Sequence, residues 1–238
     1  MNDNYEILKF DSELFGFGVA RILVPLLNTA ALQEIIAELR QQKIKLLYWP
    51  SDSLDKTSQA AARAMQGHLC SEQVTYVINL ENIASFSTPE VIEYAGTLAT
   101  PELETLALAA GKYSRFVCDP NFPHHLFLKL YQNWIANSAN KTLASKILVI
   151  QRQQKIVGMI TLGEKNQRGD IGLLGIDENF RGHGLGKQLV YAAQKEFAKQ
   201  GYNAAQVVTQ RANIPACKLY EKCGFNAEKI ENYYHFWL

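Results

Sequence analysis

The chain lacks several features that would mark a special class of protein. It has no excess of either charge, with 24 Lys and Arg against 23 Asp and Glu and a formal net charge of +1, so no strong field is available to recruit nucleic acid. No apolar run approaches the ~18 residues that a membrane-spanning helix needs. The first residues, MNDNYEILKF, carry acids where a signal peptide carries a basic stretch and then an apolar one. We therefore expect a cytoplasmic protein with no nucleic-acid or membrane partner.

Cysteine is also scarce. The four cysteines are Cys70, Cys118, Cys217 and Cys223; they form no CxxC pair and have no histidine at zinc-ligand spacing. The sequence therefore predicts neither a disulfide framework nor a metal site, and we expect the cysteines to be small core residues. What the chain does have is 238 residues, of which 47% are hydrophobic, enough for one large domain or two small ones.

The spacing of apolar residues predicts an α/β arrangement. We expect only a small helical portion in the segment 96–112, whose pattern is short and flanked by glycines. We expect Pro50 to end the strand 43–50. The expected helices are 29–43, 55–67, 124–140, 185–199 and 214–223. The expected strands are 43–50, 68–80, 146–153, 155–165, 171–177, 204–210 and 233–238, with a turn at 166–170.

This order divides the chain into three parts. They are a smaller N-terminal α/β lobe over residues 1–96, a crossing segment over 97–112 and a larger C-terminal domain over 113–238. The strand–helix–strand unit of the lobe and the one that closes the chain share an outline but little identity, which leaves coincidence and a decayed duplication both open. The oligomeric state is open too, a homodimer included.

The most informative segment is RGHGLGKQL at 181–189, where three of the first six residues are glycine and a helix follows directly. Free N–H groups and the helix dipole make such a turn an anion site, and glycine lets the backbone approach a phosphate closely. A dinucleotide fingerprint is incomplete, because strand 204–210 carries no acid, and a Walker motif fails because Gln188 follows Lys187. A pyrophosphate site and a plain strand-to-helix turn both remain open.

Two motifs together resemble those of the Gcn5-related N-acetyltransferases. Arg181, Gly184 and Gly186 fit the (R/Q)xxGx(G/A) turn, which in that superfamily cradles the pyrophosphate of coenzyme A. Further along, NIPACKLYEKCGF at 213–225 fits the second signature, N-x-x-A-x-x-L-Y-x-x-x-G-F. The resemblance covers residues from about 145 to 238. It implies a mixed, mostly antiparallel sheet flanked by helices, with acetyl-CoA or another short-chain acyl-CoA as co-substrate and no metal.

The resemblance also implies roles for particular residues. Tyr220 would protonate the departing thiolate after an amine attacks the thioester directly, and backbone amides around Leu174 and Ile176 would hold the pantetheine arm. The other cofactor-binding candidates are Arg181, Gly182, His183, Gly184, Leu185, Gly186, Lys187, Asn213 and Ala216. An acyl-cysteine route is not expected, because the two cysteines that flank Tyr220 face different sides of the helix and no histidine is spaced to activate either.

The first half resembles one branch of this superfamily, the bacterial dTDP-fucosamine acetyltransferases. Those enzymes acylate the amino group of a nucleotide-linked amino-dideoxyhexose for cell-surface polysaccharide. The matching residues are Phe15-Gly16, Ser114-Arg115-Phe116 and Trp134-Ile135. The resemblance implies a dTDP-amino sugar as partner. It leaves open whether the amine is on C3 or C4, and whether the group moved is acetyl or a longer one such as 3-hydroxybutanoyl.

A sugar nucleotide needs polar and aromatic partners and a base. The substrate-binding candidates are Tyr113, Ser114, Arg115, Asn232 and Tyr233, with Arg115 expected to bind the phosphates. Glu72 falls where this family places an acid and is the candidate base; an exposed glutamate without a role is the alternative. Two other functions stay open. One is acetylation of a protein or small amine, for which Glu72 and Arg115 would be dispensable. The other is acyl-CoA sensing without catalysis, for which Tyr220 would be dispensable.

Overall fold

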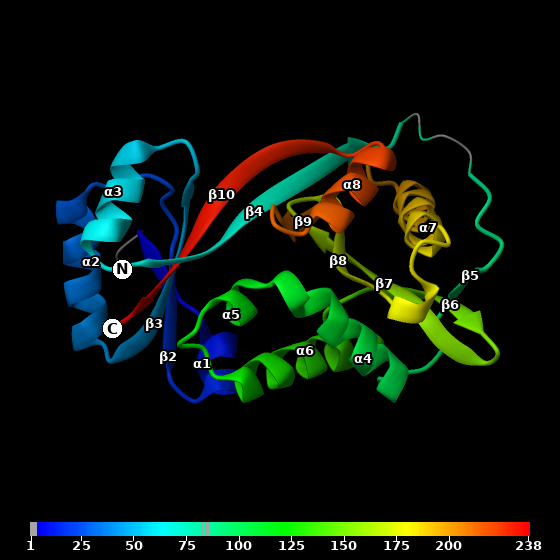
Figure 1. Cartoon of the computed structure of the whole chain (residues 1–238), viewed down its shortest axis with the longest axis horizontal. Coiled ribbons are helices and arrows are strands. Elements are labelled where there is room, and N and C mark those ends of the chain that lie inside the picture. The colour runs from blue at the N-terminus through cyan, green and yellow to red at the C-terminus, as the bar shows by residue number, and fades with distance from the viewer. Residues whose placement is uncertain (1–3, 82, 84–85) are drawn as a thin grey trace.

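The computed structural model describes residues 4–81, 83 and 86–238. Its strands form one twisted sheet in the order β1-β2-β3-β10-β4-β9-β8-β7-β6-β5 (Figure 1). The strands are β1 (Tyr5–Ile7), β2 (Gly18–Ile22), β3 (Ile44–Asp52), β4 (His68–Asn79), β5 (Val91–Glu93), β6 (Lys146–Arg152), β7 (Lys155–Lys165), β8 (Arg168–Ile176), β9 (Ala204–Gln210) and β10 (Asn226–Trp237). The helices are α1 (Lys9–Phe15), α2 (Thr29–Gln41), α3 (Lys56–Ala64), α4 (Pro101–Ala110), α5 (Arg115–Cys118), α6 (His124–Ala139), α7 (Leu185–Lys199) and α8 (Ile214–Lys222), with 3-10 turns η1 (Gly111–Tyr113) and η2 (Glu178–Phe180).

Two long antiparallel strands, β4 and β10, join the two ends of the sheet (Figure 1). β10 also pairs with β3, and β4 also pairs with β9, so the last strand of the chain lies in the interior of the sheet. Only β2–β3 and β8–β9 are parallel among the strand pairs of the described residues. The expected mixed, mostly antiparallel sheet flanked by helices is confirmed. The division at residues 96 and 113 stays a prediction.

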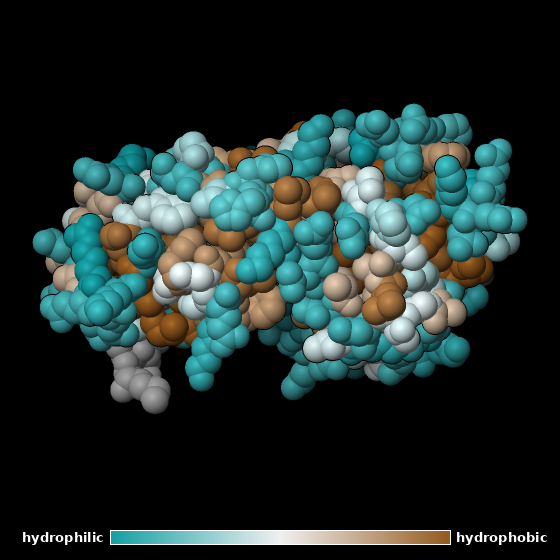
Figure 2. Space-filling model, turned by 90° about the horizontal axis from the view of Figure 1, so that it is seen from below, coloured by the Kyte–Doolittle hydropathy of each residue, from teal (hydrophilic) through white to brown (hydrophobic). Residues whose placement is uncertain are grey.

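Helices cover both faces of the sheet. Because successive strand residues point to opposite faces, Leu46 and Tyr48 of β3 pack with α1, α4, α5 and α6, whereas Leu47 and Trp49 pack with α2 and α3. Helices α7 and α8 cover the second face at the other end, over β4 and β6–β9. No helix in the described ranges is both long and apolar enough to cross a membrane. On the face that Figure 2 shows, hydrophobic side chains form small patches separated by hydrophilic ones.

The segment between the halves holds a longer helix than its pattern predicts. Thr100 caps α4 by accepting a hydrogen bond from the Leu103 N–H, and the helix runs for ten residues. Leu103 and Leu106 are buried, and Gly175 of β8 makes room for them, since a Cβ there would lie 2.5 Å from the Leu106 carbonyl oxygen. The run LALAA is apolar on every side, so it carries no helical period to detect.

Two strand boundaries also differ from the expected ones. β3 continues past Pro50 to Asp52. Its pairing with β2 ends at Tyr48, so at Pro50 that edge of β3 has no strand partner. Proline, which has no N–H, therefore removes no hydrogen bond of the sheet there. β8 begins at Arg168, so the expected turn at 166–170 shrinks to Asn166 and Gln167. Both have positive φ, 55° and 60°, as a two-residue hairpin turn requires.

Candidate active site

Strands β8 and β9 separate part of the way along the sheet. They pair only from Gly169↔Ala205 to Ile171↔Val207. Beyond Ile171, β8 continues along β7 to Ile176, while β9 continues along β4 to Gln210. The edge of β8 over 172–176 that faced β9 therefore has no strand partner in the described part of the chain, and its backbone groups can bind an extended ligand. We call this divergence the fork.

A groove of about 400 Å³ follows this free edge. It brings together all of the cofactor-binding candidates except His183: Leu174, Ile176, Arg181, Gly182, Gly184, Leu185, Gly186, Lys187, Asn213 and Ala216. His183 is exposed in the same turn but does not line the groove. Tyr113, expected at the acceptor, lines this groove instead.

The turn before α7 presents unsatisfied backbone donors to the groove. Gly182 and Gly184 have φ of 81° and 78°, and nothing lies within 4 Å of a Cβ built on either. Gly184 occupies the N-cap position, so no side chain caps the first N–H groups of α7. Arg181 folds back so that its Nε donates to the Ile176 carbonyl at 3.2 Å. The result is a helix N-terminus free to bind an anion.

The second motif builds α8, whose Ala216 and Leu219 line the groove. Asn213, a good N-cap residue, caps the helix by accepting from the Ala216 N–H at 3.3 Å, and Gly224 follows the helix with φ of 89°, which glycine adopts readily. Tyr220 is buried against Tyr76 and does not line the groove. Burial, and then the neighbouring cysteines, raise the pKa of Tyr220 well above its usual range, so the hydroxyl stays protonated.

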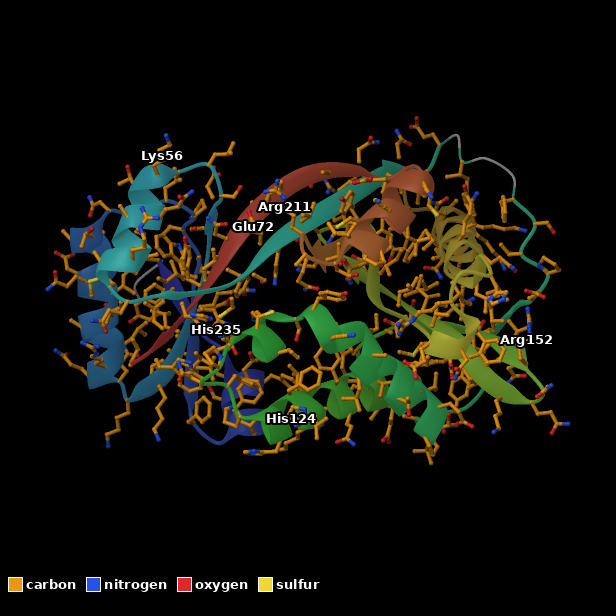
Figure 3. The ribbon with its side chains drawn as sticks, in the orientation of Figure 1. Lys56, Glu72, His124, Arg152, Arg211 and His235 are labelled. Carbon is orange, nitrogen blue, oxygen red and sulfur yellow. The ribbon has the colours of Figure 1, made fainter. Side chains whose placement is uncertain are left out.

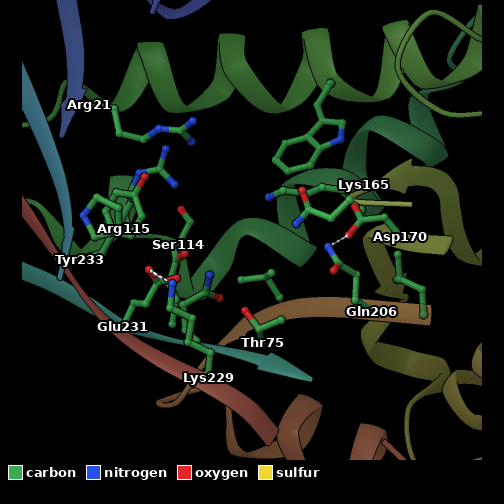
Figure 4. A pocket seen from close by; sticks show the side chains of 18 of the residues that line it. Arg21, Thr75, Ser114, Arg115, Lys165, Asp170, Gln206, Lys229, Glu231 and Tyr233 are labelled. Carbon is green, nitrogen blue, oxygen red and sulfur yellow. Dashed lines mark hydrogen bonds and ion pairs between the residues drawn. The ribbon is translucent and has the colours of Figure 1, made fainter. Parts of the chain in front are cut away.

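A second, larger cavity of about 730 Å³ adjoins the fork, where residues of β8 and β9 line it (Figure 4). Elements from both halves of the chain line it, including α1, β2, β4, α5, α6, β8, β9 and β10. β8 contributes Asp170 to Gly172 to this cavity and Leu174 to Ile176 to the groove. The two spaces therefore adjoin along one strand.

One end of the cavity is built around Arg115. Its guanidinium carbon lies 4.7, 4.2 and 4.5 Å from the ring centres of Tyr48, Phe116 and Tyr233, an aromatic cage that favours a cation. The Arg115 Nε, the Ser114 Oγ and the Tyr48 hydroxyl are buried and make no hydrogen bond of good geometry within the described residues, although Tyr48 lies near Asp11 and Ser114 near Tyr131. Buried donors are rarely left unpaired, so this end has the composition of an anion-binding subsite.

The opposite end of the cavity holds Lys165, Asp170 and Gln206 (Figure 4). The Gln206 Nε2 donates to the Asp170 carboxylate at 2.9 Å. Burial raises the pKa of Asp170, and its effect exceeds the opposing effects of the Gln206 hydrogen bond and the Lys165 charge. A carboxylate in such surroundings takes up a proton more readily than an exposed one.

Four predicted residues lie outside both spaces: His183 and Tyr220, already described, and Glu72 and Asn232. Glu72 and Asn232 are cross-strand partners on β4 and β10, whereas their neighbours Gln73 and Glu231 line the cavity. Since side chains alternate between faces, Glu72 and Asn232 point to the other face of the sheet. The Glu72 carboxylate is paired with Arg211 at 3.1 Å (Figure 3). The structure does not bring either residue to the acceptor cavity, while Ser114, Arg115 and Tyr233 do line it.

The sequence gives little sign of several other cavity residues. These include Asp11, Arg21, Asp170, Gln206 and Glu231, which come from α1 and from four different strands. The sequence gives one sign of a polar face: Gln206 and Gln210 of β9 are four residues apart and so lie on the same side of the strand. Which strands adjoin, and which face turns inward, depends on a sheet order that brings β10 between β3 and β4.

A forked sheet with a glycine turn at one mouth of the fork is the architecture of a coenzyme A-dependent acetyltransferase. Residues 110–225 match the model of the Acetyltransferase (GNAT) family. The resemblance to the superfamily seen in the sequence is confirmed; the narrower resemblance to dTDP-fucosamine acetyltransferases stays a prediction.

The chain is also similar to named proteins and to a solved structure. The spore coat polysaccharide biosynthesis protein SpsD of Bacillus subtilis (strain 168) is 26% identical over 124 residues, which are 52% of this chain and 43% of that protein. The streptothricin acetyltransferase of Escherichia coli is 33% identical over 79 residues, 33% of this chain and 45% of that protein. The chain thus spans less than half of the length of either relative. A GCN5-related N-acetyltransferase from Sphaerobacter thermophilus shares the fold, with a TM-score of 0.64 and 12% identity over 98% of this chain and 75% of that one.

Proposed function

We propose that the protein is an N-acyltransferase that moves a short acyl group, acetyl or one such as 3-hydroxybutanoyl, from coenzyme A to the amino group of a dTDP-linked amino-dideoxyhexose for surface polysaccharide. The observation that carries the proposal is the pair of adjoining spaces: a groove with a free helix N-terminus, and a cavity of about 730 Å³ that ends in a caged arginine.

The groove fits an acyl-CoA in two respects. The uncapped N–H groups at the start of α7, with Lys187 beside them, suit a pyrophosphate. The free edge of β8 over 172–176 suits the amides of a pantetheine arm, which would pair with it as another strand does. Bound there, the thioester supplies the acyl group next to the fork.

The cavity fits an acceptor with an anionic end. Arg115 and Ser114 offer unpaired donors to the phosphates of a sugar nucleotide, and Tyr233 offers a ring at the same place. The resemblance of the first half to sugar-nucleotide acetyltransferases, and the polysaccharide pathway in the name of SpsD, support this choice of acceptor.

The reaction needs one group to protonate the leaving thiolate. We assign this role to Tyr220, which is buried on α8 directly after Leu219, a residue that lines the groove, and whose raised pKa keeps its proton available at neutral pH. A well-placed general acid contributes about 10²–10⁴-fold to the rate. Nucleophilic catalysis by cysteine is not part of the proposal, because Cys217 and Cys223 are buried among apolar residues.

The proposal is tested by measuring release of free thiol. Acetyl-CoA and 3-hydroxybutanoyl-CoA are each mixed with dTDP-linked 3-amino- and 4-amino-dideoxyhexoses, and Tyr220→Phe is assayed in parallel. We expect turnover with one sugar and one acyl donor, reduced about a hundredfold or more in the variant. Absence of thiol release with every sugar would contradict the proposed acceptor. Undiminished activity in Tyr220→Phe would contradict the assigned acid.

A second candidate acceptor is a small amine, which the match to streptothricin acetyltransferase favours. An acceptor without an anionic group would not use Arg115. The same assay with a panel of uncharged amines separates the two: turnover that survives Arg115→Met belongs to this alternative.

A further inference from the structure

The acceptor amine must lose a proton before it can attack. An aliphatic amine has a pKa near ~10, as lysine does, so it arrives as an ammonium ion at neutral pH. Glu72, the base that the sequence suggests, faces away from the cavity. Four other acidic side chains line the cavity: Asp11, Asp170, Glu228 and Glu231.

Three of these acids already face a cation. Glu228 accepts two hydrogen bonds from Arg168 at 2.8 and 3.0 Å, and Glu231 is paired with Lys229 at 2.7 Å. Burial raises the pKa of Asp11 as well, against the charges of Arg115 and Arg21, but these two cations at the anion-binding end would repel an ammonium ion. A carboxylate held by a cation is a weak base, because protonation would break the pair.

Asp170 differs from the other three. Its hydrogen-bond partner is the neutral amide of Gln206, and within the described residues it makes no ion pair. Lys165 of β7 lies near enough to lower its pKa, but burial outweighs that effect and leaves the pKa raised. Asp170 is thus the cavity acid best able both to attract an ammonium ion and to take its proton.

The position of Asp170 suits this role as well. It lies one residue before the last paired position of β8 and β9, on the cavity side of the fork. A strand rises about 3.3 Å per residue, so the Asp170 Cα lies about 7 Å from Gly172 and about 13 Å from Leu174, at the groove. An amine between Asp170 and the fork would contact both the carboxylate and a thioester seated at the free edge of β8.

Neighbouring side chains hold the backbone at this point. The Thr161 hydroxyl accepts from the Leu173 N–H at 2.8 Å. A Cβ on Gly172 would lie 2.8 Å from that hydroxyl and 3.6 Å from the Trp134 Nε1. The strand is therefore clamped between β7 and α6 directly beside Asp170, which gives the carboxylate a fixed distance to the fork.

We propose that Asp170 is the catalytic base of the acceptor site. Its carboxylate takes one proton from the ammonium ion, directly or through one water. The nitrogen lone pair then forms the bond to the thioester carbon, the carbon–sulfur bond breaks, and the thiolate takes the Tyr220 proton. The nitrogen gives up its second proton as Tyr220 is reprotonated, and Asp170 releases its proton to solvent, so the net products are the amide, the free thiol and one proton. This assignment rests on the proposed acyl transfer, but not on which amine is the acceptor.

The test compares Asp170→Asn with the wild type over a range from about pH 6 to pH 10. The variant keeps the size of the side chain and a carbonyl oxygen for Gln206. We expect its kcat to fall about 10²–10⁴-fold at neutral pH with the KM for acetyl-CoA unchanged. The deficit should shrink as pH rises, since more of the amine is then already neutral. Glu164→Gln, on the adjacent hairpin and outside the cavity, is the matched control and should behave like the wild type.

Two results would overturn the assignment. One is an Asp170→Asn enzyme within threefold of the wild type at every pH, and the other is a loss that is the same at every pH, as misfolding would produce. Assaying Glu72→Gln in parallel shows whether the residue suggested by the sequence is the base instead.

A binding measurement makes the test independent of turnover. Equilibrium dialysis compares a dTDP-amino sugar with its hydroxyl analogue, and we expect the wild type to prefer the ammonium form and Asp170→Asn to lose that preference. No preference in the wild type would also overturn the assignment. The two proposals can fail separately. If Asp170→Asn acylates the dTDP-amino sugar as fast as the wild type, Asp170 is not the base. If the enzyme acylates another amine instead and Asp170→Asn is slow, only the proposed sugar acceptor is wrong.

Discussion

At the scale of single residues, Arg115 shows how a side chain is prepared for a ligand before it binds. Rings of Tyr48, Phe116 and Tyr233 surround its guanidinium, and its Nε has no partner among the described residues. A lysine would keep the charge but not the flat group that stacks in the cage and offers paired donors. The shape of the cation, in addition to its charge, therefore matters here.

For this reason Arg115→Lys should weaken binding of the acceptor. A hydrogen bond to a charged group is worth about 1.5–3 kcal/mol, so the KM for the dTDP-amino sugar should rise roughly 10–100-fold. The KM for acetyl-CoA should not change, because Arg115 does not line the groove. Steady-state kinetics with each substrate varied in turn measures both values. Arg211→Lys, which changes an exposed arginine outside both spaces, is the control. An unchanged acceptor KM in Arg115→Lys would remove Arg115 from the acceptor site.

At the scale of elements, the glycine turn combines a strained backbone with an exposed helix N-terminus. Alanine at 184 would meet no atom within 4 Å, but it would have to adopt φ of 78°. That conformation costs an L-residue about 1 kcal/mol or slightly more. Any relaxation of the turn would also redirect the N–H groups that we assign to the pyrophosphate.

We therefore expect Gly184→Ala to lower the free energy of unfolding by about 1 kcal/mol and to raise the KM for acetyl-CoA several-fold. Gly201→Ala is a matched control, because Gly201 also has a positive φ, 87°, and open space around its Cβ, yet lies outside the groove. It should lose similar stability with no change in KM. If both variants raise the KM equally, the turn has no special role in binding the cofactor. Urea unfolding and initial rates give the two quantities.

The same scale shows what the sequence could and could not predict. The cap at Asn213, the left-handed Gly224 and the helix after the glycine turn follow from local chemistry, and all are found. The sequence predicts Asp170 in a turn. The hairpin turn is only two residues long, however, so β8 begins earlier and Asp170 lies within the sheet. The sequence places an acid at Glu72, but a shift of one residue along a strand moves a side chain to the opposite face of the sheet, and here Gln73 faces the cavity instead. Which face turns inward depends on contacts with residues far away in the chain.

At the scale of the whole molecule, a buried hydrogen-bonded pair connects the last strand to the end of the helix that carries Arg115. His235 Nδ1 lies 2.7 Å from an Asp119 oxygen that also accepts from the Trp237 indole at 3.0 Å (Figure 3). Asp119 directly follows α5, so β10 and α5 are held together. Burial lowers the pKa of His235 to about 4, although the Asp119 hydrogen bond acts in the opposite direction.

This pair predicts a loss of stability in mild acid. Between about pH 6.5 and pH 4 the unfolded histidine binds a proton that the folded one does not, so the free energy of unfolding should fall by about 3 kcal/mol over that range. The stabilisation is complete above about pH 6.5. His235→Asn places an amide donor near the former Nδ1 but cannot titrate there, so it should remove this part of the slope. Urea unfolding at several pH values measures it, and an equal slope in both proteins would assign the acid sensitivity to other groups.

The interior place of β10 also has a consequence for synthesis. A ribosome makes β3 and β4 long before residues 226–237, yet these two strands meet only through β10. Until the final strand emerges, β3 and β4 each keep an open edge, and such edges invite pairing with other chains. A message cut short before codon 226 would thus leave a polypeptide with the glycine turn already made and its sheet divided, prone to aggregate before it could bind any ligand.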